Sequence, residues 1–354
     1  MTPSITIGIP VYNGMPWICE TVESIRQQTC SDFAVLIIDD GSTDGSGEYL
    51  QSLSDPRFRL IRQENRGLTA TLNRMLAEAE TPWLMRQDAD DIAFPERVVR
   101  TLECIQRYPN AGLLFSHACH YQNNRTFGRL LTTEGSPEVL HRLTISGYLP
   151  TICHSTVVLN VAKTRELGGY RFDLNVEDYD IFWRMALAHD LRLIPETLVG
   201  YRMRNGSISA RNMRSQASAI LYVQYLLLSA LCGIDPKGYE SVKECLDTII
   251  DRRALDYRLH MRKALTALGA LRFSAMFAGA VRGVASSPEL FVRRVLYQMG
   301  KQIGQPQTVH VGVDPEKFFA RAKELWPNEK AQPRISSYVQ PVTARAVRSH
   351  FAGS

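Results

Sequence analysis

The hydrophobic positions in the N-terminal part of this chain follow two different periods. Short strand patterns stand at residues 5–11, 34–38, 58–62, 83–87 and 112–116, and the one at 34–38 is fully apolar, as expected for a strand covered on both faces of a sheet. Between them, apolar residues recur at the spacing of amphipathic helices, at 17–28, 44–53, 68–80 and from Pro95 to about 108. We place Pro95 at the first position of its helix, where proline is favoured. Strands that alternate with helices predict an α/β fold with a mainly parallel sheet between helices.

The pattern changes twice further along the chain. Residues 119–148 are polar and weakly periodic, which predicts a loop-rich insert. A strand at 155–159, a helix at 178–189 and short strands at 191–194 and 199–202 follow; after Ser209 only helical patterns remain, at 215–232, 239–255, 259–272 and 288–302. We therefore expect an α/β domain over residues 1–209, a helical C-terminal region over 210–332 and a poorly ordered tail over 333–354.

Charge is distributed unevenly along the chain. The net charge is +5, yet residues 251–354 contain 17 Lys and Arg against 7 Asp and Glu, a net of +10, which leaves 24 against 29, or −5, for the rest. A basic C-terminal part favours an anionic partner surface, membrane or glycan. We expect no nucleic-acid partner, because the basic residues are dispersed among long apolar helices and form no nucleic-acid motif.

Cysteine usage and the apolar stretches predict a compartment. The seven Cys form no Cys-x-x-Cys pair and lie mostly in apolar runs, as expected for buried thiols in a reducing cytosol and not for disulfides or a zinc site. The first apolar run has no basic segment before it, so we expect no signal peptide. The longest apolar stretch, 219–234, contains Gln224 and Ser229 and is shorter than the ~20 residues of a membrane span. We expect a cytoplasmic protein without a transmembrane helix.

Three carboxylates in four residues, Asp88, Asp90 and Asp91, follow the apolar run that includes Met85. Neighbouring carboxylates repel one another and are costly at the end of a strand unless a cation lies among them. Mg²⁺ and Mn²⁺ suit carboxylate oxygens and, when held by one or two carboxylates, keep positions that substrate phosphates fill. The cluster therefore predicts a nucleotide or another phosphorylated substrate. A solvated acidic turn is the alternative.

A second polar group, residues 39–44, follows the apolar run at 34–38. Ligands of doubly wound folds bind at such carboxyl ends of strands, where Asp40 can accept hydrogen bonds from a nucleobase or a ribose hydroxyl. Ser42 or Thr43 can cap the next helix, but a plain capping turn does not explain the paired Asp residues. At the end of the first strand, Tyr12 offers a ring that can stack on a base, although an ordinary surface turn explains the same residue.

A third group combines Gly168-Gly169-Tyr170 with residues 176–180, which include Glu177 and Asp178. Asp178 stands at the start of a predicted helix, whose dipole favours an ionised carboxylate. Such a carboxylate, near a metal-bound phosphate, can act as general base on a hydroxyl. An acidic N-cap with acidic neighbours in the first turn is an equal alternative.

In this order, the motifs resemble family 2 glycosyltransferases of the GT-A fold over about residues 4 to 210. The resemblance rests on the segments 9–14, 38–44, 65–67, 88–91, 168–170 and 177–180. It implies a GT-A nucleotide-diphospho-sugar transferase domain, with donor and acceptor halves, within residues 1–209. It also implies that the anomeric centre is inverted by direct displacement.

The resemblance implies which residues form the donor site. Asp40 would bind the base of the donor nucleotide, with Pro10 and Tyr12 beside it. Asn65 and Gly67 belong to a matching motif and would also contact the donor.

The resemblance further implies the residues that do the chemistry. Asp90 would bind the metal, Mg²⁺ or Mn²⁺, that bridges the diphosphate, and Asp88 would touch the ribose or help to hold the metal. Asp178 would be the base that deprotonates the acceptor hydroxyl, with Glu177 beside it on the acceptor side. His154 is a further acceptor-side candidate, and a structural, hydrogen-bonded histidine is the alternative.

One position departs from the family pattern. Many relatives carry Tyr-Arg-x-His after the last core strand, whereas this chain reads Tyr201-Arg202-Met203-Arg204. Arginine does not deprotonate and cannot bind a metal, but its guanidinium pairs well with a diphosphate. We therefore expect Arg204 in the donor site and a metal that is held with less help than in most relatives.

These observations predict an enzyme, a metal-dependent hexosyltransferase. Its donor would be a nucleotide-diphosphate sugar, UDP-sugar in the first place, and its acceptor a hydroxyl of a bacterial surface glycan or of a lipid-linked precursor. Transfer to a polyprenyl phosphate and a catalytically silent sugar-nucleotide-binding protein are the alternatives.

The last predicted helix, 288–302, has an apolar stripe with basic residues elsewhere on its surface. The stripe consists of Leu290, Phe291, Val295, Leu296 and Met299, and the basic residues are Arg293, Arg294 and Lys301. Such a helix can lie on an anionic membrane, which would make the protein peripheral on the inner face of the cell membrane. Packing against the catalytic domain explains the stripe equally well.

Overall fold

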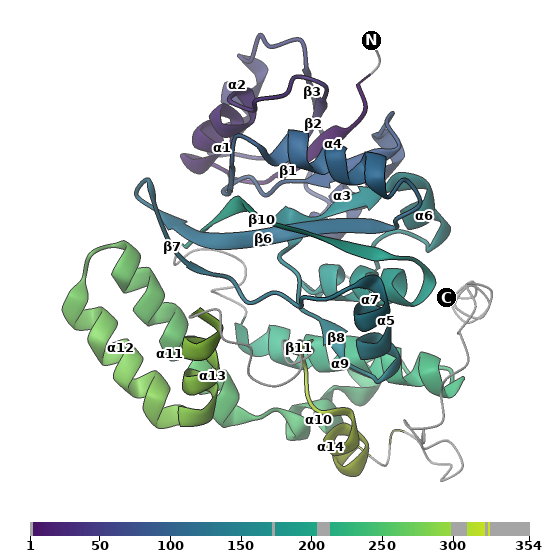
Figure 1. Cartoon of the computed structure of the whole chain (residues 1–354), viewed down its shortest axis with the longest axis vertical. Coiled ribbons are helices and arrows are strands. Elements are labelled where there is room, and N and C mark those ends of the chain that lie inside the picture. Colours follow the sequence, from purple (N-terminus) through teal and green to yellow (C-terminus); the bar gives the residue numbers. More distant parts are fainter. Residues whose placement is uncertain (1–2, 172–173, 204–212, 299–309, 323–324, 326–354) are drawn as a thin grey trace. The chain divides into compact units, whose positions relative to one another are not determined.

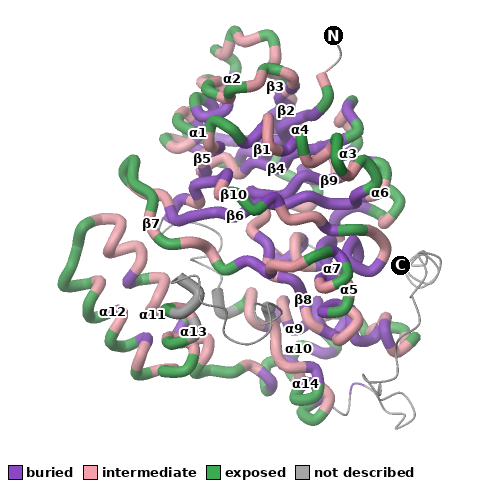
Figure 2. Tube along the Cα trace, in the orientation of Figure 1, coloured by how far each residue is buried: buried purple, intermediate pink, exposed green. Residues whose placement is uncertain are grey.

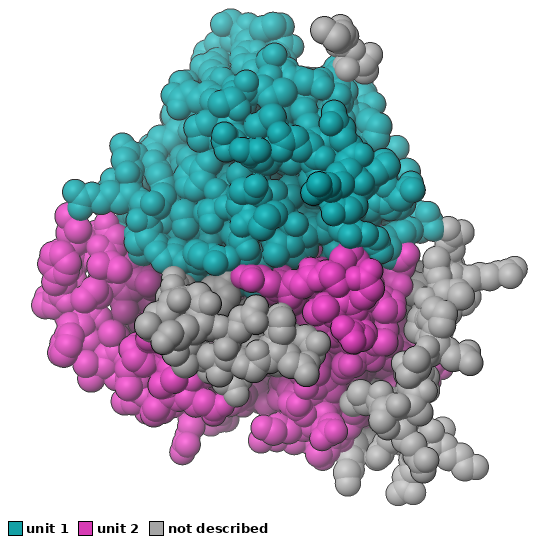
Figure 3. Space-filling view, viewed as in Figure 1, with its two compact units in different colours: residues 1–132, 152–173, 189–202 teal, residues 133–151, 174–188, 203–354 magenta. Residues whose placement is uncertain are grey.

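The computed structural model describes residues 3–171, 174–203, 213–298, 310–322 and 325. The chain divides into two compact units, shown in two colours in Figure 3. The first comprises Met1–Thr132, Ile152–Asp173 and His189–Arg202, and the second comprises Thr133–Thr151, Leu174–Ala188 and Met203–Ser354. The expected boundary at residue 209 and Arg204 both fall outside the described residues.

The first unit contains a nine-stranded sheet of order β3-β2-β1-β4-β9-β6-β10-β5, with β7 paired to β6 (Figure 1). Its strands are β1 Thr6–Val11, β2 Ala34–Asp39, β3 Phe58–Arg62, β4 Trp83–Arg86, β5 Ile92–Ala93, β6 Leu113–Gln122, β7 Arg125–Arg129, β9 Val158–Asn160 and β10 Leu191–Arg202. The pairs β1–β2, β2–β3, β1–β4 and β6–β10 are parallel. Strand β9 is antiparallel to both β4 and β6, so the sheet of this α/β fold is mixed.

The helices of the first unit cover this sheet because their apolar faces meet its side chains. They are α1 Trp17–Arg26, α2 Ser46–Gln51, α3 Leu68–Glu78, α4 Arg97–Arg107 and α6 Val161–Glu166. Ile18, Val22 and Ile25 of α1 are buried in one core cluster with residues of β1 and β2. Every residue of β1 and nearly every residue of β2 is buried, as Figure 2 shows, which confirms the expectation of strands covered on both faces.

The second unit is mainly helical. It contains α5 Pro137–Ile145, α7 Glu177–Ala188, α9 Met213–Cys232, α10 Tyr239–Ile249, α11 Arg252–Gly269, α12 Phe273–Ser286, α13 Pro288–Gln298 and α14 Pro315–Arg321, with a two-stranded sheet of β8 Leu149–Pro150 and β11 His310–Val311. Gln224 of α9 is buried and donates to the carbonyls of Gly147 and Val313, so the polar residue in this apolar helix fastens two distant segments.

Helix α9 is the only described helix that is long and apolar enough, by these two criteria alone, to cross a membrane. Its window Ser215–Cys232 is 61% buried inside the structure, which a core helix of a globular unit also shows. Its length and composition are therefore weak evidence for a membrane span.

Several predicted elements were wrong in extent. The region 119–148 is not a loop-rich insert, because it contains the end of β6, β7 and α5; the buried polar residues Ser116, His117 and His120 hide the strand from a hydrophobicity pattern. The two short strands after residue 190 are one strand, β10, whose register shifts near Pro195, a residue without an N–H for the ladder.

Helix boundaries account for the other differences. Pro95 is not the first helical residue of α4, because the N-cap is Glu96 and Pro95 precedes it. The pattern predicted as one helix over 239–255 breaks at Asp251, whose carboxylate accepts a hydrogen bond from Ala254 N at 3.1 Å and starts α11. Helices α6, α12 and α14 were not predicted.

Candidate functional site

The polar groups predicted at strand ends lie at one edge of the sheet in the first unit. Strands β1, β2 and β4 are parallel neighbours, with Val11 paired to Asp39 and Gly8 paired to Arg86. Tyr12 and Asp40 follow directly after β1 and β2, and Asp88 comes two residues after the end of β4. This edge is where ligands bind in open α/β sheets.

Asp88 is held by a buried arginine and a buried serine. Arg86, at the end of β4, donates from Nη2 to Asp88 Oδ1 at 2.6 Å, and its side chain is only 2% exposed. Ser155 Oγ donates to Asp88 Oδ2, and Asp88 N–H donates back to Ser155 Oγ at 3.3 Å. Burial alone raises the pKa of Asp88, but Arg86, His154 and the Ser155 hydrogen bond outweigh it and place the pKa below its usual value. Asp88 is therefore an ionised carboxylate at neutral pH.

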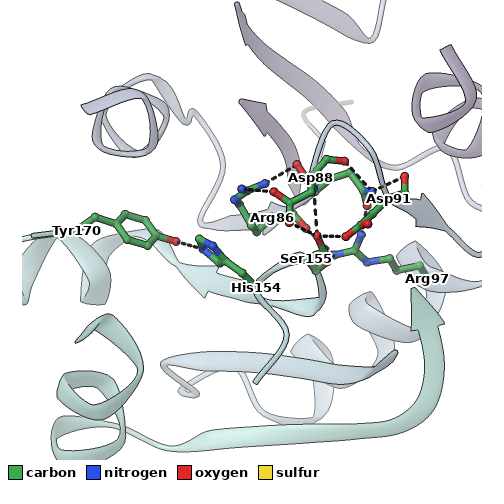
Figure 4. A network of polar contacts seen from close by, with 8 residues as sticks. Arg86, Asp88, Asp91, Arg97, His154, Ser155 and Tyr170 are labelled. Atoms are coloured by element: carbon green, nitrogen blue, oxygen red, sulfur yellow. Dashed lines mark hydrogen bonds and ion pairs between the residues drawn. The ribbon is translucent and has the colours of Figure 1, made fainter. Parts of the chain in front are cut away.

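Asp91 has a structural position in the same network (Figure 4). It is buried, its Oδ1 accepts from Arg202 N at 2.8 Å, and its Oδ2 lies 2.6 Å from Ser155 Oγ. Burial, together with the charges of Asp90 and Asp88, raises the pKa of Asp91 well above its usual value. Asp91 ties the acidic loop to β10 and to Ser155.

A proton count explains this geometry. Ser155 Oγ is within hydrogen-bond distance of one oxygen of Asp88 and one oxygen of Asp91, but a hydroxyl carries one hydrogen and can donate only once. The second contact needs a proton on a carboxyl group, and Asp91 is the acid whose pKa is raised. Of the two carboxyl groups, Asp91 is therefore the one that takes up a proton more readily, and Asp88 is the one kept ionised.

A second buried arginine supports the loop from behind. Arg97 of α4 donates from Nη2 to the carbonyl oxygens of Arg86 at 2.7 Å and of Ser155 at 2.5 Å, and from Nη1 to the side chain of Gln87. Burial lowers the pKa of Arg97 to about 10, so it still carries its charge at neutral pH. It joins β4 to the segment that carries Ser155.

Asp90 is half-buried, and its backbone oxygen accepts from Arg202 Nε at 2.7 Å. Arg202, in the motif that departs from the family pattern, also pairs with Glu20 at 2.8 Å and stacks over the ring of Trp17. The loop that carries Asp90 is therefore fixed from the last strand of the unit as well as from β4.

Asp88 and Asp90 fit a divalent cation that takes few ligands from the protein. Within the described ranges, no cluster of three or more His, Cys, Asp or Glu could hold a metal by itself. Two carboxylates on one turn, one of them kept ionised, match a cation whose other positions are filled by a diphosphate and water. A closed protein-only metal site is not part of this arrangement.

Asp40 organises the neighbouring loop. It is buried, and it accepts from Gln63 Nε2 at 2.6 Å, Arg66 N at 2.9 Å and Gly67 N at 3.0 Å. Gly67 has a φ of +85°, a conformation that favours glycine. Asn65 is exposed on this loop. Because Asp40 already accepts three hydrogen bonds, a base N–H can use only the acceptor capacity that remains on the Asp40 carboxylate.

Tyr12 lies exposed above a rigid turn, with 56% of its surface accessible, whereas Pro10 is buried in β1. Asn13 N–H donates to Ser42 Oγ at 2.9 Å, and Thr43 N–H donates to Asn13 Oδ1 at 2.8 Å. Ser42 and Thr43 do not cap α2, which begins at Ser46, so that expectation was wrong. Both residues instead fix the turn that presents Tyr12.

His154 and the Gly-Gly-Tyr motif form a second part of the site. Asn73 of α3 accepts from Tyr170 N at 2.9 Å and donates to Tyr170 O at 2.8 Å, and His154 Nε2 lies 2.9 Å from the Tyr170 hydroxyl. A Cβ on Gly169 would approach Asn73 Oδ1 to 2.5 Å, which explains a glycine there. Burial, assisted by Arg86, lowers the pKa of His154 to about 3, so this histidine is neutral.

The predicted base belongs to the second unit. Helix α7 begins at Glu177, which is buried, and half-buried Asp178 lies in its first turn, where Oδ1 accepts from Tyr179 N at 2.8 Å. Asp180 forms a fully buried ion pair with Arg184, at 2.6 Å.

Sequence reasoning missed Arg86, Arg97 and Ser155. A single arginine within the apolar run of β4 was the one available signal for Arg86, because an apolar strand has no reason to carry a charge without a buried partner. Ser155 lies 67 residues from Asp88 in the sequence. No local pattern relates the two positions.

Comparisons with known proteins show what this mixed sheet, with acidic residues at one edge, is similar to. Residues 6–168 match the model of Glycosyl transferase family 2. Putative glycosyltransferase EpsE of Bacillus subtilis (strain 168) is 26% identical over 218 residues, which cover 59% of this chain and 73% of that protein. Chondroitin synthase of Escherichia coli is 28% identical over 190 residues, covering 52% of this chain and 26% of that protein. Over residues 6–168 the chain is therefore similar to the family 2 glycosyltransferases.

Solved structures confirm the fold. Staphylococcus aureus TarS 1–349 has a TM-score of 0.51 at 15% identity, with 84% of this chain and 92% of that chain covered. Mannosyltransferase PcManGT from Pyrobaculum calidifontis, in complex with GDP-Man and Mn²⁺, has a TM-score of 0.51 at 19% identity, with 93% and 89% covered. At these identities the likeness concerns the fold, which is the expected GT-A type with a helical C-terminal region.

Proposed function

We propose that this protein is an inverting, metal-dependent glycosyltransferase that moves a sugar from a nucleotide-diphosphate donor to a hydroxyl group. The observation that carries the proposal is the pair Asp88 and Asp90 at the carboxyl edge of the sheet, with Asp88 kept ionised by Arg86 and Ser155. TarS in complex with UDP-GlcNAc has a TM-score of 0.50, and PcManGT binds GDP-Man with Mn²⁺, which supports this class of donor. We take a UDP-sugar as the first donor.

The donor lies across the ends of β1, β2 and β4 in this proposal. The ring of Tyr12, exposed above its fixed turn, stacks on the base. Asp40 contacts the base with the acceptor capacity that its three hydrogen bonds leave, and it holds the loop with Asn65 and Gly67 against the nucleotide. Arg204 pairs with the diphosphate.

Asp88 and Asp90 bind Mg²⁺ or Mn²⁺, which supplies positive charge next to the leaving diphosphate. Asp178 accepts the proton of the acceptor hydroxyl, the acceptor oxygen forms a bond to the anomeric carbon, and the bond from that carbon to the phosphate oxygen breaks. Attack from the face opposite the diphosphate inverts the anomeric centre. Glu177 and His154 lie on the acceptor side; neutral His154 orients Tyr170 and does not carry charge.

The acceptor in this proposal is a hydroxyl of a bacterial surface glycan or of its lipid-linked precursor. A hydroxyl needs a base, whereas a polyprenyl phosphate is already an anion and needs little assistance. The presence of Asp178 in the first turn of α7 therefore supports the hydroxyl acceptor.

A thermal-shift screen of nucleotide sugars, with and without Mn²⁺, tests the donor proposal. A ligand that binds only the native state at one hundred times its Kd stabilises it by about 2.7 kcal/mol. We expect UDP-sugars to raise Tm, and Mn²⁺ to increase the shift. Asp90→Asn should lose the contribution of Mn²⁺ and keep part of the nucleotide shift. If no nucleotide sugar changes Tm with or without metal, the proposal is wrong; a donor-induced shift without turnover would identify a silent binding protein.

A further inference from the structure

Helix α12 in the second unit has two faces of opposite character. It packs along α11 as a hairpin (Figure 1), and Gly279 and Gly283 are buried against that helix. A Cβ on Gly279 would lie 3.1 Å from Ala264, and one on Gly283 would lie 2.8 Å from Met261 Sδ. The glycine face is therefore committed to close packing with α11, and the larger residues of α12 are left on other faces.

The opposite face of α12 is apolar and accessible. Phe273, Phe277 and Val281 recur every four residues, on one side of the helix, and they are 61%, 67% and 50% exposed. Leu271, in the turn before the helix, is 52% exposed. Figure 2 shows α12 as exposed or half-buried along most of its length, in contrast with the buried strands. Single exposed apolar residues are ordinary, but an aligned group of this kind marks an interaction surface.

The surroundings of this face are basic. Residues 251–298, from the start of α11 to the end of α13, contain nine Lys and Arg against three Asp and Glu. Exposed Arg272 and Arg282 stand near the two ends of the apolar face, and α12 itself contains no acidic residue. An apolar face bordered by arginines is typical of helices that lie in the interface of an anionic membrane. The same charge opposes pairing with a second copy, because two basic surfaces would meet.

We propose that the outward face of α12 docks this protein on an anionic lipid surface. Leu271, Phe273, Phe277 and Val281 enter the boundary between headgroups and acyl chains, while Arg272 and Arg282 contact the headgroup phosphates. The surface consists of other residues than the stripe expected on α13, in which Leu290 and Phe291 are half-buried and Val295 is 39% exposed. The proposal does not depend on glycosyl transfer, so the two can fail separately.

Vesicle flotation with the full chain tests the docking face. We expect the wild type to float with vesicles of phosphatidylglycerol and phosphatidylcholine in equal parts, to stay unbound with phosphatidylcholine alone, and to dissociate in high salt. Phe273→Ser with Phe277→Ser should weaken binding at least about tenfold, because two large apolar groups no longer leave water. Val292→Ser is the control, because Val292 is an apolar residue of α13 that is 53% exposed and whose loss should leave binding unchanged.

Phe277→Trp provides a second readout that does not depend on the folding of the double variant. After the wild-type emission is subtracted, the tryptophan emission of Phe277→Trp should shift to shorter wavelength when anionic vesicles are added. The emission of Val292→Trp should not shift. Three results would each overturn the proposal. The folded wild type does not bind anionic vesicles, the double variant binds them as well as the wild type, or the emission of Phe277→Trp does not shift at saturating lipid. A dimer that light scattering detects in the wild type and not in the double variant would assign the face to a second copy and overturn it as well.

Discussion

Two clusters of three carboxylates in four residues, 88–91 in the first unit and 177–180 in the second, look alike in the sequence and are built alike in part. Each contains one buried acid with a structural contact, Asp91 with Ser155 and Asp180 with Arg184. Each also contains a half-buried acid assigned to chemistry, Asp90 or Asp178. Each cluster therefore combines at least one buried carboxylate that holds the fold with a half-buried one that can meet a substrate.

The clusters differ in how their charge is balanced. Asp180 meets an arginine one turn along its own helix, an arrangement that a single element can provide. Asp88 is balanced by Arg86 of β4 and by Ser155, which comes from a distant segment. The first cluster thus depends on the tertiary structure of its unit, whereas the ion pair of the second is local.

The largest expected effect is on kcat and concerns Asp178 of the second cluster. Asp178→Asn should lower kcat by about 10²–10⁴-fold, because it removes the general base, and should leave the donor-induced thermal shift intact. Steady-state kinetics with a UDP-sugar and an acceptor measure it. An unchanged kcat would contradict the assignment of the base.

Arg86 and Arg184, both buried and each paired with an aspartate, allow a comparison of two variants. Arg184→Met leaves a fully buried Asp180 without its ion-pair partner and should lower the free energy of unfolding by about 3–5 kcal/mol. Asp180→Leu together with Arg184→Met should recover much of this loss. Arg86→Met should cost less stability, because the side chain of Asp88 is 33% exposed, but it should weaken donor binding more than Arg184→Met does. Chemical denaturation measures the free energy of unfolding of both variants, and titration with the donor measures their donor affinity. Equal donor affinity in both variants would contradict the role of Arg86.

The bridge between Asp88 and Asp91 gives a smaller effect. Ser155→Ala removes a hydroxyl that contacts both carboxyl groups and should lower the free energy of unfolding by about 1.5–3 kcal/mol, as for a hydrogen bond to a charged group. It should also raise the KM for the donor, because Asp88 loses one of its two supports. Ser155→Thr keeps the hydroxyl and serves as the control. An Ala variant with wild-type stability and KM would show that the bridge contributes nothing.

The last prediction concerns pH. The folded-state pKa of His154 is lowered to about 3 from 6.5, so acid protonates the unfolded chain before the folded one. Stability from this group is fully present above pH 6.5 and is lost as the pH falls toward 3, by up to about 1.4 kcal/mol per pH unit. The stability advantage of the wild type over His154→Gln should therefore shrink between these values. Denaturation curves across this range measure it, and a pH-independent difference would contradict the assigned protonation state.

Much of the first unit could be predicted because its strands are continuous apolar runs. Strand β3 was predicted at its observed limits, and β1, β2 and β4 within one residue at an end. The predicted strand at 112–116 was shorter than β6, because His117 and His120, which are buried in the structure, are typical of loops in the sequence alone. In the second unit, the start of α11 depended on one capping carboxylate, Asp251, and α12 was missed.

The sequence by itself determined the alternation of strands and helices, the order of acidic motifs at strand ends, and hence the family resemblance. Tertiary structure decided which carboxylates are ionised and which are structural, since Asp91 meets Arg202 across 111 residues of sequence and Ser155 across 64. It also decided that Phe273 and Phe277 of α12 are 61% and 67% exposed, more than any other large apolar side chain among the described residues. The physical reason is the same in each case: periodicity reports the face on which a side chain lies, whereas charge state and exposure depend on the groups that distant segments bring against it.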